Sequence, residues 1–448
     1  MNIYFHIDEL NRDAVVASAL KKKFKAEGHR LVYGNRVSGR LLNYFHDAFD
    51  VIVMPRPHFL YDNWGESWID WNAKFVMLST ESLGIICKDH QVMARTLLEK
   101  GYFEGEKKFV DRIDAFCIWG NKQMQSIIDF APELADKFHV VGHPRHDVSC
   151  SGGLSKAERE NRSGKISVGI LPRAVGLNDY FGRSALDGFT TLLDDHFQYE
   201  YNNKITGQKL VSKRPSAQPA ENLAVQAIDA ATQIKIADEL CKSNFQVYVR
   251  PHPKENLSVW KKIFRTAGVN AEVVSSSQPI THWLAQLDYI VGPPSTGFYD
   301  AIMSGVTPIS IDNLDCRRKL FIDELWEDNN RLMPHVFKPG SISELLEYVQ
   351  SRRFLELDGE VLKVLKEEAD YPECQSSLDK FVNICESLVS SNGRVAFAGF
   401  ALVSFLITRP VFNFLWRVKL RFTDRKENSA MFVMSRTRIR FIDELSQV

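Results

Sequence analysis

One stretch constrains the fold of this chain more than any other: residues 288–312, DYIVGPPSTGFYDAIMSGVTPISID. DYIVG predicts an apolar strand, FYDAIMSG a helix and VTPISI a second strand. Parallel strands need such a crossover, so the stretch predicts one strand–helix–strand unit of a parallel sheet. Ser295 and Thr296 stand where N-caps belong, and we expect outward amide N–H groups beside two hydroxyls, which suit a phosphate. The alternative is an ordinary capped helix.

The same alternation recurs along the chain. The other apolar runs that predict strands are NIYFHI, LVY, VIVMP, KFVML, DAFCIWG, FHVVG, ISVGILP, FQVYV and EVV. A chain of 448 residues exceeds one usual core. We therefore predict an α/β fold with two doubly wound Rossmann-like domains, at residues 1–150 and 165–350, then a helical segment at 351–390 and a tail at 391–448.

Composition and missing motifs exclude several classes of protein. The formal net charge of +0 argues against a nucleic-acid footprint over the whole chain. The seven cysteines form no CxxC pair and the N-terminus shows no signal-peptide pattern, which indicates a cytoplasmic protein with reduced thiols. Without GxGxxG after the first strand, GxxxxGK[ST], HExxH or a DxD pair, dinucleotide dehydrogenases, P-loop kinases and zinc peptidases lose support. We expect no metal and no cofactor.

Cation-capable side chains follow the strand FQVYV. Arg250, His252 and Lys254 lie in VRPHPKEN, at the carboxyl end of that strand, where they could compensate the charge of a phosphate or diphosphate. Asp300, about one helical turn beyond Thr296, could accept hydrogen bonds from a ribose diol. The alternative is that Arg250, His252 and Lys254 form a solvent-exposed basic loop without a ligand. The pattern favours a nucleotide-phosphate site in the second domain.

Acids at strand ends of the first domain are candidates for catalysis. Glu81 follows KFVML directly after two hydroxyl residues and could act as a general base or a nucleophile. Asp8 and Glu9, after the first strand, are rival candidates. His58 and His143 could line a cleft beside these acids, and the alternative for His143 is a structural residue that ends a strand.

The last residues change in character. The apolar run 395–408 is interrupted by Arg409 and Pro410, and it is shorter than the roughly 20 residues of a membrane span. Eight cations follow, interleaved with aromatic residues: Arg417, Lys419, Arg421, Arg425, Lys426, Arg436, Arg438 and Arg440. This pattern is typical of a segment that lies on an anionic membrane surface. The alternative is a C-terminal helix packed against the body.

The motifs STESLG, DAFCIWGNKQ, VVGHPRHD, RPHPKEN and GPPSTGFYDAIMSG, in this order, resemble those of bacterial surface-carbohydrate biosynthesis proteins of the GT-B glycosyltransferase fold. Over residues 1–351 the chain is similar to capsule and lipopolysaccharide transferases that use CMP-activated Kdo or sialic acid, and more distantly to CDP-glycerol glycerophosphotransferases. The resemblance implies two domains that face a cleft. It assigns Glu81 to an acidic catalytic motif, from which the chain departs because Thr80 replaces one acid and two residues precede Gly84.

By the same resemblance, His252 belongs to a His-Pro motif that contacts the donor nucleotide, Ser295 and Thr296 match a Ser/Thr motif at the phosphate, and Asp300 stands where related enzymes carry an acid for the ribose. Together with the basic loop and the turn before the helix, the predicted donor-binding residues are Arg250, His252, Lys254, Ser295, Thr296, Gly297 and Asp300. The implied function is transfer of a sugar from a nucleotide-activated donor to a growing surface glycan or glycolipid, at the cytoplasmic face of the inner membrane. Three alternatives stay open: a nucleotide-sugar epimerase of the same fold, a CDP-polyol phosphotransferase and a non-catalytic assembly subunit.

Overall fold

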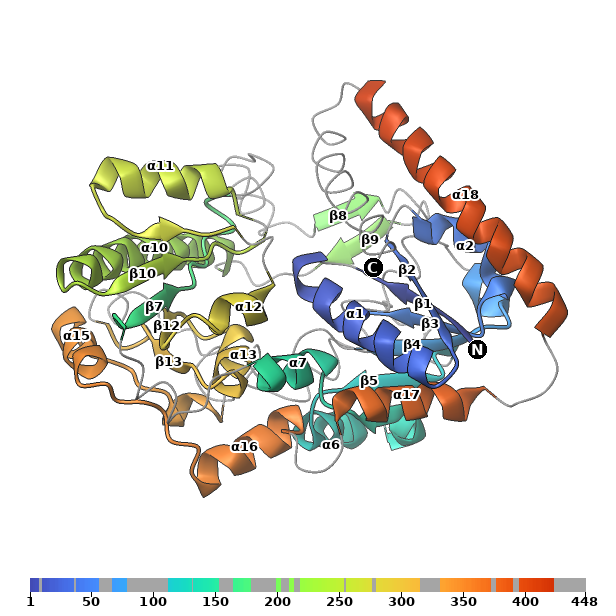
Figure 1. Cartoon of the computed structure of the whole chain (residues 1–448), viewed down its shortest axis with the longest axis horizontal. Coiled ribbons are helices and arrows are strands. Elements are labelled where there is room, and N and C mark those ends of the chain that lie inside the picture. Colours follow the sequence, from blue (N-terminus) through green and yellow to red (C-terminus); the bar gives the residue numbers. More distant parts are fainter. Residues whose placement is uncertain are drawn as a thin grey trace. The chain divides into compact units, whose positions relative to one another are not determined.

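The computed structural model divides into two compact units (Figure 1). Unit 1 comprises Met1–Val148 and Leu365–Val448, and unit 2 comprises Ser149–Val364. The residues that the structure describes are 1–7, 10–35, 38–55, 67–78, 112–130, 132–152, 164–178, 199–202, 209–212, 218–253, 255–275, 279–314, 331–371, 376–389 and 395–422.

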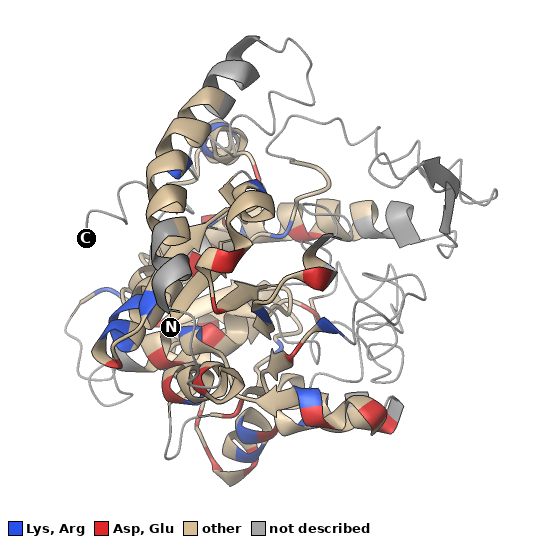
Figure 2. Ribbon diagram, turned by 90° about the vertical axis from the view of Figure 1, so that its right-hand side faces the viewer, with Lys and Arg blue, Asp and Glu red and all other residues tan. Residues whose placement is uncertain are grey.

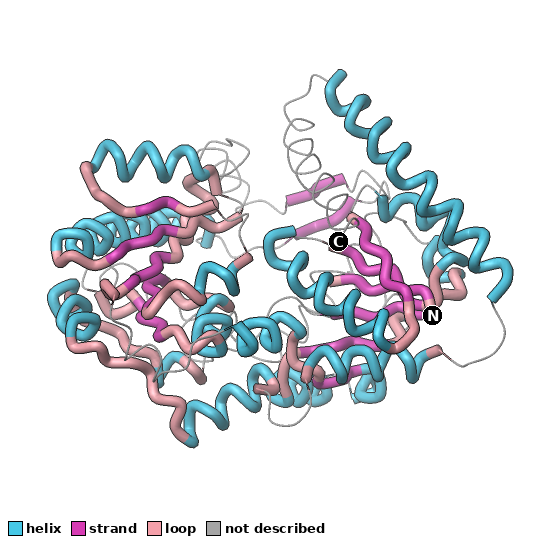
Figure 3. Tube along the Cα trace, viewed as in Figure 1, coloured by secondary structure: helices cyan, strands magenta, loops and turns pink. Residues whose placement is uncertain are grey.

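Unit 1 is built on a parallel sheet of six strands, drawn in magenta in Figure 3. The strands are β1 (Asn2–His6), β2 (Arg30–Gly34), β3 (Val51–Met54), β4 (Lys74–Leu78), β5 (Ala115–Ile118) and β6 (Phe138–Val140). Their spatial order is β2-β1-β3-β4-β5-β6. The chain therefore reverses its direction of travel across the sheet between β1 and β3.

Both faces of this sheet are buried, as parallel sheets require. One face packs on α1 (Leu10–Ala26) and α17 (Ser377–Leu388), through a core that includes Ile3 and Phe5 of β1. On the other face, Tyr4 packs with η1 (Ser38–Leu41), α2 (Leu42–Phe45) and α18 (Val395–Phe422). Successive residues of β1 thus enter opposite cores, which follows from the two-residue period of a strand.

Short elements complete unit 1. They are η2 (His46–Ala48), η3 (Ser67–Asp70), α6 (Asn121–Phe130) and η6 (Pro132–Lys137), and the helices α7 (Pro144–Gly152) and α16 (Gly359–Ala369) span the boundaries between the units. Gly34 at the end of β2 is needed because a Cβ there would clash with the ring and hydroxyl of Tyr4. That close approach fixes β2 against the aromatic side of the core.

Unit 2 has a parallel sheet of five strands, ordered β11-β10-β7-β12-β13. The strands are β7 (Ser167–Ile170), β10 (Gln246–Val249), β11 (Glu272–Val273), β12 (Tyr289–Gly292) and β13 (Thr307–Ser310). The remaining elements of the unit are α10 (Gln218–Lys242), α11 (Leu257–Ala267), α12 (Ile280–Leu284), α13 (Gly297–Met303), η8 (Met333–His335), α15 (Ile342–Gln350) and an antiparallel pair, β8 (Tyr199–Asn202) with β9 (Lys209–Ser212).

Sequence-local signals fix several ends of these helices. The Asn256 side chain accepts a hydrogen bond from Ser258 N and starts α11, and Gly268 ends it in the left-handed conformation at φ 68°. Ser341 caps α15 in the same way by accepting from Glu344 N. The predicted strands of both domains are present, and the predicted fold class, two doubly wound α/β domains, is confirmed.

The C-terminal helix α18 is continuous through Pro410. Leu402 and Phe405 enter the core of unit 1, and the Arg409 guanidinium donates to Tyr33 O at 2.8 Å. The helix thus packs on the body through one face. In the part of the chain that the structure describes, no helix is long and apolar enough to cross a membrane.

Candidate functional site

The sheet of unit 2 has a topological switch point between β7 and β12. From β7 the chain adds β10 and β11 on one side, and then returns to place β12 and β13 on the other side. Ligands of open α/β sheets bind beyond the carboxyl ends of the strands at such a point. The candidate site of unit 2 is therefore formed by the segments that follow β7, β10 and β12.

Close backbone packing shapes this edge of the sheet. Leu171 N, just beyond β7, donates to Val291 O at 2.9 Å. The segments of β7 and β12 therefore stay hydrogen-bonded almost to the end of β12. A Cβ on Gly292 would lie 2.8 Å from Leu171 O. Because glycine has no Cβ, the backbone at Gly292 can lie this close to Leu171.

Arg250 follows β10 and lies beneath this edge. Its backbone N–H donates to Ile170 O at 2.9 Å, its side chain is only 6% exposed, and its guanidinium carbon lies 5.6 Å from the centre of the Trp283 ring. Burial lowers the pKa of Arg250 to about 10, while the charge of Asp300 acts in the opposite direction. Arg250 therefore remains a cation at neutral pH, held on an aromatic face.

Asp300 lies in the first turn of α13 and is also buried. The structure therefore brings together two predicted site residues from different strand–helix units, since the charge of Asp300 acts on Arg250. The charge of Asp300 supports the charged form of the buried Arg250. The predicted contact of Asp300 with a ribose stays a prediction.

The turn before α13 differs from the prediction in one respect. Thr296 is the N-cap by position, but its backbone is helical, at φ −58° and ψ −22°, and its side chain makes no cap hydrogen bond. Capping side chains normally need an extended backbone to reach back to the helix. Instead, Ser295 O accepts from Phe298 N at 3.0 Å and Thr296 O accepts from Tyr299 N at 3.2 Å. The prediction that a hydroxyl caps this helix is therefore wrong for Thr296.

The loop after β10 is held by an acid that the sequence prediction did not single out. Glu255 is 3% exposed and accepts hydrogen bonds from Ala174 N at 2.9 Å and from Trp260 Nε1 at 2.5 Å. Burial raises the pKa of Glu255 to about 7 despite these bonds. It fastens the loop after β10 to the segment after β7. A Glu at a loop end with Trp one turn into the next helix is the sequence signal that could have indicated this role.

Two side chains of this edge reach solvent. His252 is exposed, and its carbonyl accepts from Glu255 N at 2.8 Å, so the anchored acid also shapes the backbone at His252. Arg173, two residues from the hydrogen-bonded Leu171, is exposed as well, and the prediction missed it. A basic residue directly after an apolar strand is the same signal that identified Arg250. Lys254 lies outside the described residues.

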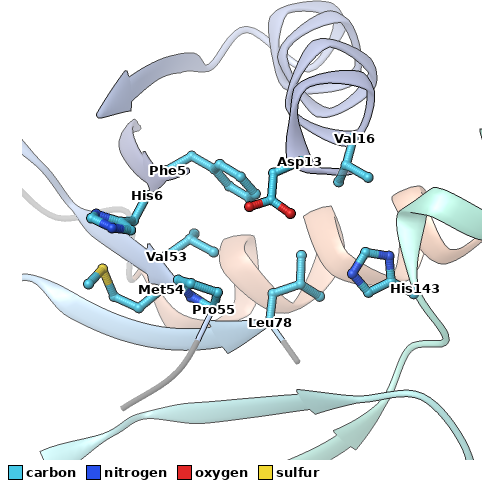
Figure 4. Close-up of a pocket in the computed structure, with 9 residues that line it drawn as sticks. All are labelled: Phe5, His6, Asp13, Val16, Val53, Met54, Pro55, Leu78 and His143. Atoms are coloured by element: carbon cyan, nitrogen blue, oxygen red, sulfur yellow. The ribbon is translucent and has the colours of Figure 1, made fainter. Parts of the chain in front are cut away.

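Unit 1 has its own switch point, between β1 and β3. A small pocket lies at the carboxyl ends of these strands and is lined by Phe5, His6, Asp13, Val16, Val53, Met54, Pro55, Leu78 and His143 (Figure 4). Asp13 of α1 points into it, with His6 and His143 on either side. The pocket therefore combines an apolar floor with one carboxylate and two imidazoles.

Of the candidates from the first domain, the structure places His143 at this pocket. Its Nδ1 accepts a hydrogen bond from Arg145 N at 3.0 Å, so the ring both supports the local backbone and lines the pocket. The next histidine, His146, is buried against Trp119, and burial with the charge of Arg145 lowers its pKa well below the ordinary value. His146 is therefore neutral and structural.

The sequence prediction missed His6 and Asp13, because their place at the pocket follows from the strand order. Four predicted candidates, Asp8, Glu9, His58 and Glu81, lie outside the described residues. Along the chain they follow the lining residues His6, Pro55 and Leu78 by a few positions. Among the described residues, no three His, Cys, Asp or Glu side chains are grouped as metal ligands would be.

No protein-family model matches this sequence, and no curated protein matches it. Solved structures with a similar course of the chain include the wall teichoic acid polymerase TagF, which is 11% identical, with 87% of this chain and 90% of that chain covered and a TM-score of 0.48.

Two further similar structures contain a uridine nucleotide. S. aureus MnaA with UDP is 9% identical over 88% of this chain and 98% of that chain, with a TM-score of 0.48. The UDP-GlcNAc 2-epimerase from Neisseria meningitidis bound to UDP-GlcNAc is 8% identical over 87% and 99%, with a TM-score of 0.47. At these identities and scores the likeness says nothing about substrate or reaction in this chain, so the proposed function depends on the site itself.

Proposed function

We propose that this protein is a GT-B glycosyltransferase that binds its nucleotide-sugar donor at the switch point of unit 2. The observation that carries the proposal is the meeting of Arg250, Asp300 and the turn before α13 at the carboxyl edge of one parallel sheet. Arg250 lies buried below the strand ends, and Arg173 and His252 are exposed at the same edge. These cation-capable groups outnumber the acid Asp300 and favour an anion.

In this proposal the donor phosphate lies above Arg250 and is contacted from the exposed side. His252 and Arg173 supply hydrogen bonds and charge, and the hydroxyl of Thr296, which is not used as a helix cap, supplies a further donor. Glu255 has no contact with substrate in this scheme. It holds the two phosphate-binding segments together through Ala174 N.

The reaction would be transfer of the sugar to a hydroxyl of a surface glycan. The acceptor oxygen forms a bond to the anomeric carbon, the bond from that carbon to the donor phosphate breaks, and the nucleotide leaves with the electron pair. We assign removal of the hydroxyl proton to Glu81 and binding of the acceptor to unit 1, whose pocket lies at β1 and β3. A CMP-activated Kdo or sialic acid is our first choice of donor, and no metal takes part in the scheme.

The test is turnover of CMP-Kdo, CMP-sialic acid, UDP-GlcNAc and CDP-glycerol by the full chain, with and without surface-glycan acceptors. We expect release of free nucleotide that depends on acceptor, and a loss of about 10²–10⁴-fold in Glu81→Gln, as for removal of a general base. Glu272→Gln, an exposed acid on β11, is the matched control.

Three other results would each replace the proposal. Conversion of the sugar nucleotide to its epimer without acceptor would establish the epimerase. Transfer from CDP-glycerol with cleavage inside the diphosphate would establish a polyol phosphotransferase. Turnover of no donor by a folded protein that also binds no nucleotide would leave a non-catalytic assembly subunit.

A further inference from the structure

The helix α18 has one face committed to unit 1. Ala401, Leu402 and Phe405 are buried in the core, and Arg409 is anchored to the backbone of β2. Phe405 also packs edge-on against Tyr4 and Phe49. These contacts fix the rotation of the helix about its axis, so that the opposite face is held outward.

That outward face is apolar. Its large side chains are more than half exposed: Val403 at 52%, Ile407 at 66%, Val411 at 55%, Phe414 at 61% and Leu415 at 58%. Their spacing of three and four residues places them along one side of the helix. Single exposed apolar residues are ordinary on protein surfaces, but a continuous stripe over about three and a half helical turns marks a surface that another apolar medium covers. We refer to these five residues as the outer stripe.

The charged residues of the same segment indicate which apolar medium covers the outer stripe. The helix contains no Asp or Glu, and its described part carries no red residue in Figure 2. Arg417, Lys419 and Arg421 follow the outer stripe in its last turns. Apolar side chains with neighbouring cations and no acids complement a bilayer with anionic head groups. A second copy of α18 would instead bring like charges together.

We propose that the outer stripe docks this protein on an anionic lipid surface, with α18 lying in the plane of that surface. Since the inner face of α18 remains packed on unit 1, only the stripe enters the lipid, and the whole body is held at the membrane. This inference is independent of the donor and of the reaction, because it rests on α18 alone.

The test is flotation of the full-length protein with lipid vesicles. We expect the protein to float with vesicles that contain phosphatidylglycerol and to bind vesicles of pure phosphatidylcholine more weakly. Ile407→Ser with Phe414→Ser should weaken the partitioning by about tenfold or more, because both side chains lose most of their apolar surface. These positions are exposed, so the variant retains the packing of α18 on unit 1.

The matched control is Val259→Ser with Leu362→Ser, which removes exposed apolar side chains from α11 and α16 and should leave flotation unchanged. Arg417→Gln with Lys419→Gln should reduce the preference for phosphatidylglycerol, because each cation near the surface contributes part of the attraction to anionic lipid. The proposal is overturned if wild type binds neither vesicle, or if the stripe variant floats like wild type. It is also overturned if light scattering shows a dimer that the stripe variant dissociates, since the stripe would then meet a second copy.

Discussion

The buried acid Glu255 makes stability depend on pH in a predictable direction. Its carboxylate is enclosed with Ala174 N and Trp260 Nε1 as donors, and burial raises its pKa from 4.5 to about 7. A raised pKa means that the folded protein binds the proton more tightly than the unfolded chain. The stabilisation that belongs to the protonated acid is therefore fully present below pH 4.5 and is lost as pH rises through about 7.

The size of the effect follows from the interval between the two pKa values. One pKa unit corresponds to about 1.4 kcal/mol, so the interval from 4.5 to about 7 corresponds to roughly 3 kcal/mol at most. Glu255→Gln removes the titration and leaves a neutral side chain at every pH. The amide N–H₂ of the glutamine must face Ala174 N or Trp260 Nε1, and that donor then loses its acceptor. This loss lowers the free energy of unfolding of the variant by the same amount at every pH, so the variant is less stable than wild type in acid.

The assay is denaturant unfolding of wild type and Glu255→Gln, followed by Trp fluorescence between about pH 5 and about pH 8.5. We expect the stability advantage of wild type to shrink by about 2–3 kcal/mol over this range, or to reverse. Glu272→Gln, at an exposed position of β11, should differ from wild type by the same small amount throughout. A difference between wild type and Glu255→Gln that does not change with pH would refute the reasoning.

Two further substitutions test the packing of unit 1. Gly34→Ala should lower the free energy of unfolding by about 1–3 kcal/mol, because Tyr4 must move to admit the new methyl group. The control is Gly359→Ala, which has open space around it. Equal melting temperatures for the two variants would contradict the packing of Gly34 against Tyr4. Arg409→Met should cost about 1–3 kcal/mol by leaving a buried carbonyl of β2 without its donor, and it should expose α18 to limited proteolysis. A protease-resistant α18 in that variant would mean that the hydrogen bond does not hold the helix.

The fold could be predicted because its signals are local. Each strand is a short apolar run ended by turn residues, and 288–312 contains a complete strand–helix–strand unit in one segment. The basic residues after β10 could be placed at the carboxyl edge of a sheet for the same reason. The position where a strand ends is indicated by its own residues, so it could be predicted without knowing which strands lie next to it.

What the sequence did not indicate depends on which strands become neighbours. The pocket of His6, Asp13 and His143 exists because β1 and β3 pair, although a helix and β2 separate them in the chain. The burial of Arg250 against Trp283, and the tie from Glu255 to Ala174, are likewise contacts between distant segments. The missing side-chain cap at Thr296 reflects a helical backbone that residue type alone does not fix.

The outer stripe of α18 is a similar case. The apolar run, the cations and the shortness of the segment were all visible in the sequence and indicated a membrane surface. The sequence did not show which residues of α18 face outward. That depends on the packing of Phe405 in the core and on the hydrogen bond from Arg409 to β2.

The most direct test of a donor site in unit 2 is thermal stabilisation by CMP, CDP, UDP and GDP, measured for wild type, His252→Ala and the control His335→Ala. At about a hundredfold excess over the dissociation constant, binding stabilises the folded protein by about 2.7 kcal/mol. We predict a shift with one nucleotide class in wild type and His335→Ala, strongly reduced in His252→Ala, whose exposed side chain can be removed without loss of the fold. No shift with any nucleotide, or an undiminished shift in His252→Ala, would contradict a nucleotide site at the carboxyl edge of this sheet.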